Sequence, residues 1–174
     1  LEREVAKRTE EIVARELEMI MRLSRAAEFR DPETGAHIQR MSHYSRLIAE
    51  QLGLPAAEQE TILRAAPMHD VGKIAIPDHI LLKPGKLTTA EFDLMKQRAE
   101  YGYEILKNSR APLLDVAAVI ARSHHEKFDG SGYPRGLAGE DIPLFGRIVA
   151  IADVFDALTS ARPYKPAWDF DKAW

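Results

Sequence analysis

The sequence contains no cysteine, which excludes disulfide bonds, thiolate metal sites and cysteine nucleophiles together. Any metal ligands must therefore be imidazole or carboxylate groups. The sequence also lacks an apolar run that approaches ~18 residues, so we expect no membrane-spanning helix. No signal-peptide pattern is visible, and the expected location is cytoplasmic.

A large excess of charge of either sign is also missing. The formal net charge is −3 over 174 residues, which gives no basic field that would favour a nucleic-acid polymer as partner. The composition, 45% hydrophobic and 29% charged, suits one compact domain that buries a core. An anionic ligand would have to be held by local Lys and Arg side chains.

Glycine and proline are absent from residues 1–30, whose heavily charged sequence favours one long helix. Apolar residues recur seven apart, at Val5, Ile12, Met19 and Ala26. This is the spacing of one side of a coiled-coil seam, but arginines occupy the matching second layer. A solvated linker helix and a dimerising stalk are therefore both open for residues 1–30, with a separate domain over residues 31–174.

Helical signals continue through the rest of the chain, and no strand alternation accompanies them. Asp31 and Pro32 predict the start of a helix that runs to about residue 52. Further helices are predicted over about 56–68, 88–107, 113–126 and 145–159, with Thr88 and Glu91 as a capping box. Residues 71–87 contain two prolines and two glycines and predict an irregular connection. The predicted fold class is all-α.

Histidines and acids are grouped near predicted helix ends rather than scattered. The grouped residues are Glu33, His37, His69, Asp70, His124, His125 and Asp153. A mixed imidazole and carboxylate set indicates a transition-metal site, and carboxylates can bridge two ions that act on a phosphorus atom. Each member alone also fits a structural role, such as a polar helix end or a paired buried acid.

Basic and aromatic residues offer a means of binding an anion. Lys73 closely follows the His-Asp pair, and Arg162 and Lys165 flank a tyrosine in "ARPYK". Arg can fork onto a phosphate and Lys can supply a point charge, although ordinary solvated bases explain them equally well. Tyr133, between Gly132 and Pro134, is expected to be a rigid exposed aromatic that can stack on a base or pack on a partner.

Several segments together resemble the HD-GYP family, a branch of the HD superfamily of metal-dependent phosphohydrolases. They are "RDPETGAH", "HDVGKIAIPDHILLKPGKLT", "HHEKFDGSGYPRGL" and "IADVFDALTSARPYK", and the match runs from about Ala26 to Trp168. The resemblance implies a helical bundle with a central metal site, preceded here by the long N-terminal helix. It also implies hydrolysis of cyclic di-GMP to linear pGpG, and in many members on to GMP.

The resemblance further assigns roles to single residues. The ligands of one ion would be His37, His69, Asp70 and Asp153. Asp70 would bridge to a second ion bound by His124 and His125, and Glu33 would help to bind a third ion in members that have one. Iron or manganese is expected first, with zinc or nickel as alternatives. Lys73 would act beside Asp70 on a phosphate or leaving oxygen, Arg162 and Lys165 would hold phosphate, and Tyr133 would lie near a guanine.

One position departs from the family pattern. Members read Met-Lys-x-His where this chain reads "MKQR", so Arg98 replaces a ligand of the second ion. A guanidinium keeps its charge and offers no lone pair, so it cannot replace an imidazole. Three outcomes are open: Arg98 swings out and water fills the gap, the second ion is weakened or lost, or Arg98 fills the site and pairs with Asp70 or the substrate phosphate.

Arg98 leaves more than one function open. The leading hypothesis is a cyclic di-GMP phosphodiesterase, and the alternative is a degenerate module that binds cyclic di-GMP or a partner protein with little or no turnover. An HD-type nucleotidase acting on simple nucleotides is disfavoured by the GYP loop. From the resemblance we also expect a homodimer through residues 1–30, an upstream receiver or sensor domain, a protein partner such as a GGDEF domain at the GYP loop, and a catalytic domain truncated at its C-terminus.

Overall fold

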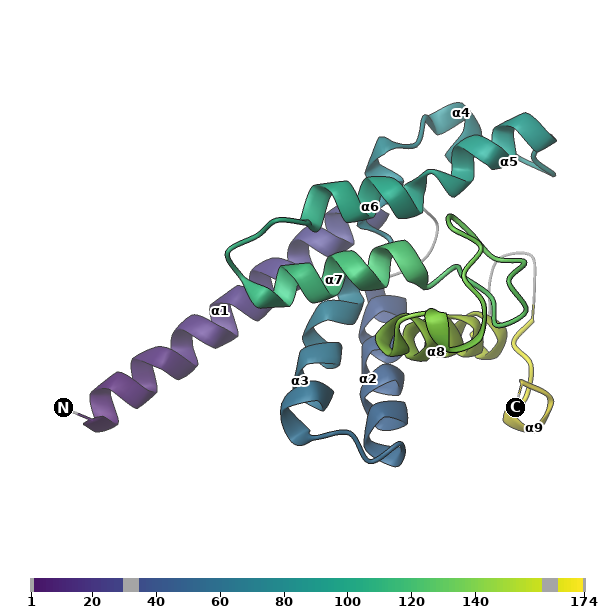
Figure 1. Cartoon of the computed structure of the whole chain (residues 1–174). Coiled ribbons are helices and arrows are strands. Elements are labelled where there is room, and N and C mark those ends of the chain that lie inside the picture. The colour runs from purple at the N-terminus through teal and green to yellow at the C-terminus, as the bar shows by residue number, and fades with distance from the viewer. Residues whose placement is uncertain (1, 30–34, 161–165, 174) are drawn as a thin grey trace.

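The computed structural model describes residues 2–29, 35–160 and 166–173, and within these ranges it contains helices and no strands (Figure 1). The α-helices are α1 (Glu2–Glu28), α2 (Gly35–Gln51), α3 (Ala56–Ala65), α4 (Asp78–Leu81), α5 (Thr89–Lys96), α6 (Arg98–Leu106), α7 (Pro112–Ser123), α8 (Leu144–Thr159) and α9 (Phe170–Ala173). Three 3₁₀ turns, η1 (Ala66–Met68), η2 (Val71–Ala75) and η3 (Gly139–Asp141), complete the described elements. The all-α prediction is confirmed.

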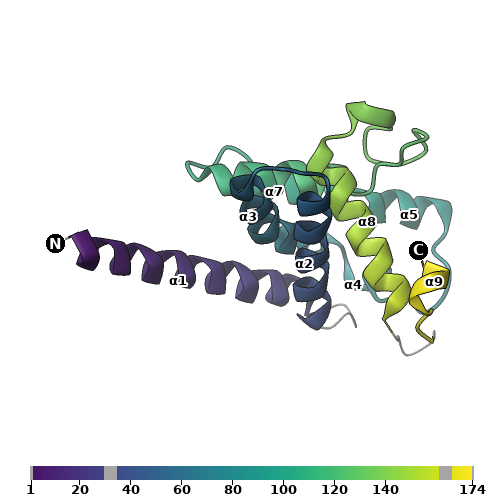
Figure 2. The ribbon, with the colours of Figure 1, turned by 90° about the horizontal axis from the view of Figure 1, so that it is seen from below.

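Helix α1 projects from the rest of the molecule, and its N-terminal part has no other element beside it (Figure 2). Only its last turns are buried, at Ser24, Ala27 and Glu28, where the helix contacts η1, η2 and the start of α2. The end of α1 is therefore part of the packed domain, although the apolar seam residues all lie exposed. No described helix is both long and apolar enough to cross a bilayer.

The hydrophobic core lies between α2, α3, α7 and α8. Met41, Ile62, Ile120 and Val149, one from each of these helices, are fully buried there. Helix α7 presents small residues such as Ala117 and Ala121 on its inner face, which allows its neighbours to approach closely. This core holds the ends of α7 and η1 in fixed positions beside α2 and α8.

Two connections differ from the sequence prediction. The capping box at Thr88 and Glu91 is confirmed, but the predicted helix 88–107 is two helices, because the chain turns at Gln97 so that α6 can pack against η2 and α7. The segment 71–87 is not irregular throughout, since it contains η2 and α4. The predicted helix start at Asp31 and Pro32 lies outside the described residues.

Two glycines, Gly72 and Gly146, allow helices to approach each other closely near the grouped histidines and acids. A Cβ on Gly72 would overlap the main chain of Arg98 and Gly102, where η2 crosses the start of α6. A Cβ on Gly146 would overlap the side chain of Ser123, where α8 crosses the end of α7. These contacts set the spacing between the elements that carry the grouped histidines and acids.

We expect Gly72→Ala to destabilise the fold strongly. The added methyl meets main-chain atoms that cannot rotate away, so the free energy of unfolding should fall by about 1 to 3 kcal/mol or more. Gly102→Ala is the matched control, because its added methyl meets the methyl of Ala121 at 3.0 Å and no main-chain atom closer than 3.4 Å, so a smaller loss is expected. Urea unfolding followed by circular dichroism measures both, and equal losses would contradict this account.

Candidate metal centre

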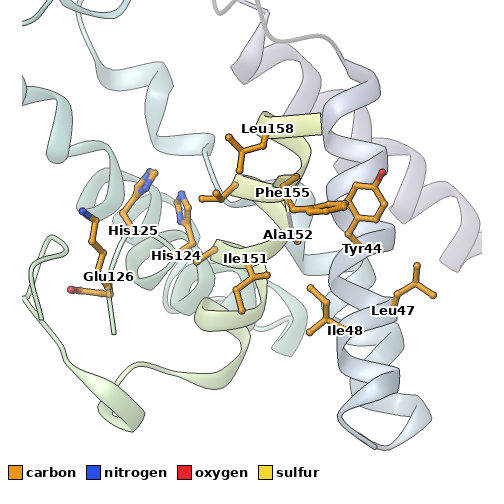
Figure 3. Close-up of a pocket in the computed structure, with 14 residues that line it drawn as sticks. Tyr44, Leu47, Ile48, His124, His125, Glu126, Ile151, Ala152, Phe155 and Leu158 are labelled. Carbon is orange, nitrogen blue, oxygen red and sulfur yellow. The ribbon is translucent and has the colours of Figure 1, made fainter. Parts of the chain in front are cut away.

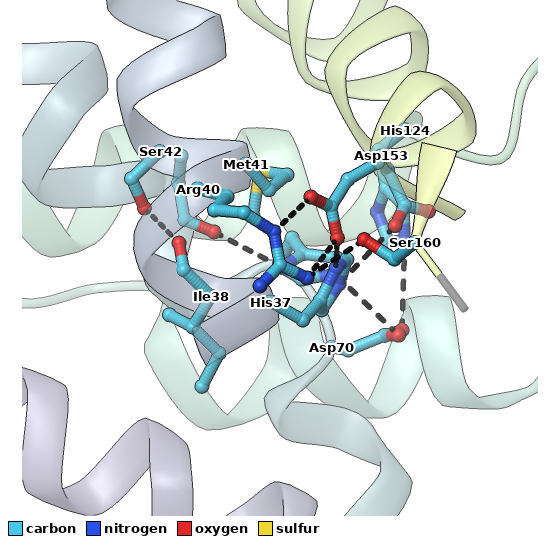
Figure 4. A network of polar contacts seen from close by, with 12 residues as sticks. His37, Ile38, Arg40, Met41, Ser42, Asp70, His124, Asp153 and Ser160 are labelled. Carbon is cyan, nitrogen blue, oxygen red and sulfur yellow. Dashed lines mark hydrogen bonds and ion pairs between the residues drawn. The ribbon is translucent and has the colours of Figure 1, made fainter. Parts of the chain in front are cut away.

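Four elements bring histidines and carboxylates together at one buried point (Figure 4). His69 and Asp70 lie between η1 and η2, His124 caps α7, His37 lies in the first turns of α2 and Asp153 lies midway along α8. The ligand atoms of His69, Asp70 and His124 all lie within 4.8 Å of one another. His37 Nε2 lies 3.4 Å from Asp153 Oδ1 on the adjoining side.

The main chain fixes which nitrogen of two histidine rings faces the cluster. Nδ1 of His69 lies 3.1 Å from the carbonyl oxygen of Ala66, and Nδ1 of His124 lies 3.1 Å from that of Ile120. A carbonyl oxygen only accepts, so each Nδ1 carries the proton and each Nε2 presents a lone pair. These two Nε2 atoms and Asp70 Oδ1 are buried and make no hydrogen bond within the described part of the chain.

A second carboxylate orients the ring of His37. Asp156 Oδ2 lies 2.7 Å from His37 Nδ1, and both carboxylate oxygens accept hydrogen bonds from Arg40. Arg40 also donates to the hydroxyl of Ser160 at 2.8 Å. A histidine held by a carboxylate in this way keeps its Nε2 directed at the cluster, an arrangement typical of metal ligands. Asp156 and Arg40 were missed in the sequence, where Asp156 reads as one more acid in the last helix.

The protonation states suit a cation. Burial raises the pKa of the Asp70 carboxyl, but the Lys73 ammonium, 2.8 Å from Oδ2, and the neighbouring histidines outweigh it and hold that pKa well below its usual range. Burial lowers the pKa of His69 to about 4 and that of His125 to about 3. Near neutral pH the carboxylate is therefore charged and the rings are neutral, which is the state that metal ligands need.

Arg98 fills the space beside His125. Its Nε and Nη2 lie 3.0 and 2.8 Å from His125 Nε2, and Nη2 donates to the hydroxyl of Tyr133 at 2.9 Å. Its Nε lies 3.8 Å from Asp70 Oδ1. Of the three outcomes open from the sequence, the structure shows Arg98 directed into the site and paired with Asp70.

Tyr133 is not the fully exposed aromatic that the sequence predicted. Its ring is half-buried and stacks on His125, with 4.7 Å between the ring centroids, and its edge meets Phe92. The glycine-rich loop around it is held by Glu126, a buried acid whose carboxylate accepts hydrogen bonds from the main-chain N–H groups of Arg135 and Leu137. Glu126 and the ring contact with His125 therefore hold the loop beside the cluster.

Three of the predicted site residues are not among those that the structure describes. Glu33, Arg162 and Lys165 lie outside the described residues. A different acid, Glu28 at the end of α1, has a carboxylate oxygen within 4.8 Å of donor atoms of His37 and His69. Its burial could not be foreseen, because Glu28 is the last residue of a helix whose other acids are all solvent-exposed.

A pocket of about 670 Å³ opens next to the cluster, between α2 and α8 (Figure 3). Residues 124–127 line one end of it. The rest of the lining is largely apolar and includes Leu47, Ile151, Val154 and Phe155. Leu47 is exposed on this face of α2. An apolar lining offers no partner for a phosphate, so the polar chemistry lies at the histidine and aspartate cluster.

The donor set fits one divalent transition-metal ion. Buried ring nitrogens and a carboxylate oxygen without hydrogen-bond partners are costly unless a cation satisfies them. Fully charged Asp70 and neutral imidazoles supply the mixed ligand chemistry that such ions prefer. The side of the cluster that includes His125 does not fit a second ion in the same way, because Arg98 already donates to its Nε2.

We expect Asp156→Ala to weaken metal binding. Without the carboxylate, His37 loses the partner that orients its ring, and the affinity for Mn²⁺ should fall about 10- to 100-fold. Asp156→Asn, which keeps the shape and one acceptor oxygen, should fall between this variant and the parent. Titration calorimetry on metal-stripped protein measures the affinity, with the melting temperature as a control for folding. An unchanged affinity in Asp156→Ala would contradict the role of Asp156 in orienting His37 for the metal ion.

Comparisons with known proteins agree with this geometry. A family model described as HD domain matches residues 11–174. The chain is 56% identical over 173 residues to the cyclic di-GMP phosphodiesterase response regulator RpfG of Xanthomonas campestris, which covers 99% of the chain and 46% of that protein. It is 49% identical over 157 residues to a cyclic di-GMP phosphodiesterase of Thermotoga maritima, covering 90% of the chain and 43% of the relative.

A third relative and a solved structure extend the comparison. A 3′3′-cGAMP-specific phosphodiesterase of Vibrio cholerae is 54% identical over 151 residues, covering 87% of the chain and 29% of the relative. The crystal structure of a cyclic GMP-AMP-specific phosphodiesterase from the same organism superposes with a TM-score of 0.60 at 22% identity, over 82% of this chain and 40% of that one, which shows a shared fold. The chain spans less than half the length of these relatives. It belongs to the HD domain family, as the resemblance of its motifs to the HD-GYP branch indicated.

Proposed function

We propose that the chain is a metal-dependent phosphodiesterase that hydrolyses cyclic di-GMP to linear pGpG, with GMP as the product where a second hydrolysis follows. The observation that carries this proposal is the buried cluster of His69, Asp70 and His124, whose donor atoms face one another without other hydrogen-bond partners in the described chain. Relatives named as cyclic di-GMP phosphodiesterases support the choice of substrate.

The chain's own residues have separate parts in the reaction. His37, His69, Asp70 and Asp153, with His124, hold a divalent ion, for which iron or manganese is our first choice. Lewis acidity, which polarises a phosphoryl oxygen and activates water, is what such an ion supplies when bound. Water adds to phosphorus, the bond from phosphorus to the 3′ oxygen breaks, and that oxygen takes a proton.

Lys73 is placed to serve the leaving oxygen. It is buried in the first turn after the His-Asp pair, and its ammonium lies 2.8 Å from Asp70 Oδ2. An ammonium beside the cluster can hold a phosphate oxygen and deliver a proton from Nζ to the 3′ oxygen as the bond breaks. Arg162 and Lys165 are proposed to bind the second phosphate, and Tyr133 to contact a guanine.

Turnover of cyclic di-GMP by the Mn²⁺-loaded chain, with pGpG and GMP separated by chromatography, tests the proposed function. We expect Asp70→Ala to lower kcat at least about 10²-fold, because Asp70 contributes to both the ligand set and the charge at the reacting phosphate. His43→Ala is the matched control, since this histidine is exposed on α2 and should leave turnover unchanged. Preferential hydrolysis of 3′3′-cGAMP would identify that dinucleotide as the substrate instead of cyclic di-GMP. Preferential hydrolysis of simple nucleotides would contradict any cyclic dinucleotide substrate.

A second candidate function is a binding module that retains the cleft and turns over little. The observation that favours it is the position of Arg98. Its guanidinium donates to His125 Nε2, the ring nitrogen that would otherwise bind a second metal ion. Cyclic di-GMP binding without turnover, in both the parent chain and Arg98→His, would establish this function in place of the enzyme.

We also propose that α1 pairs with the same helix of a second copy to form a homodimer. A receiver or sensor domain is proposed to precede this helix in the parent protein. Val5, Ile12 and Met19 are 57%, 56% and 58% exposed on the projecting part of the helix, in the register of a seam. A protein partner such as a GGDEF domain is proposed for the glycine-rich loop, where Phe128 is exposed.

Changing the seam should dissociate this dimer. Ile12→Glu places a charge in the pairing surface, so we expect sedimentation equilibrium to show a shift toward monomer. Ala14→Glu adds the same charge on another face of the exposed helix and should leave the dimer intact. A parent chain that is monomeric at high concentration would exclude pairing through α1.

A further inference from the structure

Arg98 contacts the atoms that a second ion would have to use. Its Nε and Nη2 both reach His125 Nε2, and its Nε lies 3.8 Å from Asp70 Oδ1. Arginine only donates, so His125 Nε2 is the acceptor and its single lone pair is engaged. The same lone pair cannot bind a metal ion while it accepts from the guanidinium.

The guanidinium is also held in place from another side. Nη2 donates to the hydroxyl of Tyr133, whose ring stacks on His125, and the Arg98 side chain is only 18% exposed. Arg98 begins helix α6 at the point where Gly72 allows η2 to approach it closely, so the main chain has little freedom to withdraw the side chain. A fixed positive charge this close to Asp70 repels a dication at the same position.

We infer that Arg98 replaces the second metal ion of this cleft, so that the chain binds one divalent ion and uses the guanidinium as a permanent cation for a phosphate oxygen. The contacts found for Arg98 in the described chain involve Nε and Nη2, which leaves the N–H groups of Nη1 for such an oxygen. A guanidinium binds phosphate with directed, charge-assisted hydrogen bonds, a function that a second ion would otherwise supply.

The two parts of this inference depend differently on the proposed function. The phosphate contact rests on it, because it assumes that the cleft receives a phosphodiester. The number of ions does not, because it follows from which atoms are available as ligands. A metal count therefore tests the replacement even if the chain hydrolyses no cyclic dinucleotide.

The first experiment is elemental analysis of the chain after removal of metal, reloading with Mn²⁺ and gel filtration. We expect about one ion per chain for the parent, about two for Arg98→His, which supplies an imidazole, and about one for Arg98→Lys, which keeps the charge. Two ions or none in the parent would overturn the replacement, and so would a count that stays at one in Arg98→His. Circular dichroism melting verifies that each variant is folded.

The second experiment measures the binding of inorganic phosphate to the Mn²⁺-loaded chain by calorimetry. Arg98→Gln, which keeps the length of the side chain but not its charge, should bind phosphate about 10-fold more weakly than the parent, with Arg98→Lys in between. Equal affinities in the parent and Arg98→Gln would overturn the phosphate role. A parent with one ion and normal phosphate binding but no hydrolysis would refute the proposed enzyme and leave this inference standing.

Discussion

The buried carboxylate of Asp70 is the group on which the rest of the site depends. A charge removed from water costs several kcal/mol unless opposite charges and hydrogen bonds compensate it. Lys73 at 2.8 Å and Arg98 at 3.8 Å supply positive charge, and the imidazoles of His69 and His124 close the remaining sides. The fold must therefore deliver residues from three separate segments, 69–73, the start of α6 and the end of α7, to one point, and these neighbours keep the carboxylate ionised.

Helix ends meet that requirement. The 3₁₀ turn η1 and the last turn of α7 supply main-chain carbonyl oxygens that fix the rings of His69 and His124. Helix α8 brings Asp153 into the cluster and Asp156 behind it, one turn apart on the same face. The close crossing at Gly146 keeps α8 against α7. The distance between these two helices is therefore set at the same crossing for the apolar core and for the polar cluster.

Arg98 changes the balance of charge at this point. With Lys73 it gives Asp70 two cationic neighbours. An arginine retains its charge at any accessible pH and needs no supply of metal, but it cannot polarise water as a metal ion can. Because Arg98 also binds the hydroxyl of Tyr133, the glycine-rich loop is tied to the same charge.

The sequence by itself determined the helical class, the capping box at Thr88 and the grouping of histidines with acids, because these depend on local spacing and residue chemistry. It also identified Arg98 as incompatible with an imidazole's role. Only the tertiary structure decided where that side chain points, that Asp156 and Arg40 hold His37, and that Glu28 is buried beside it. These outcomes join residues as much as 119 positions apart, so they depend on how helices pack, which no local pattern records.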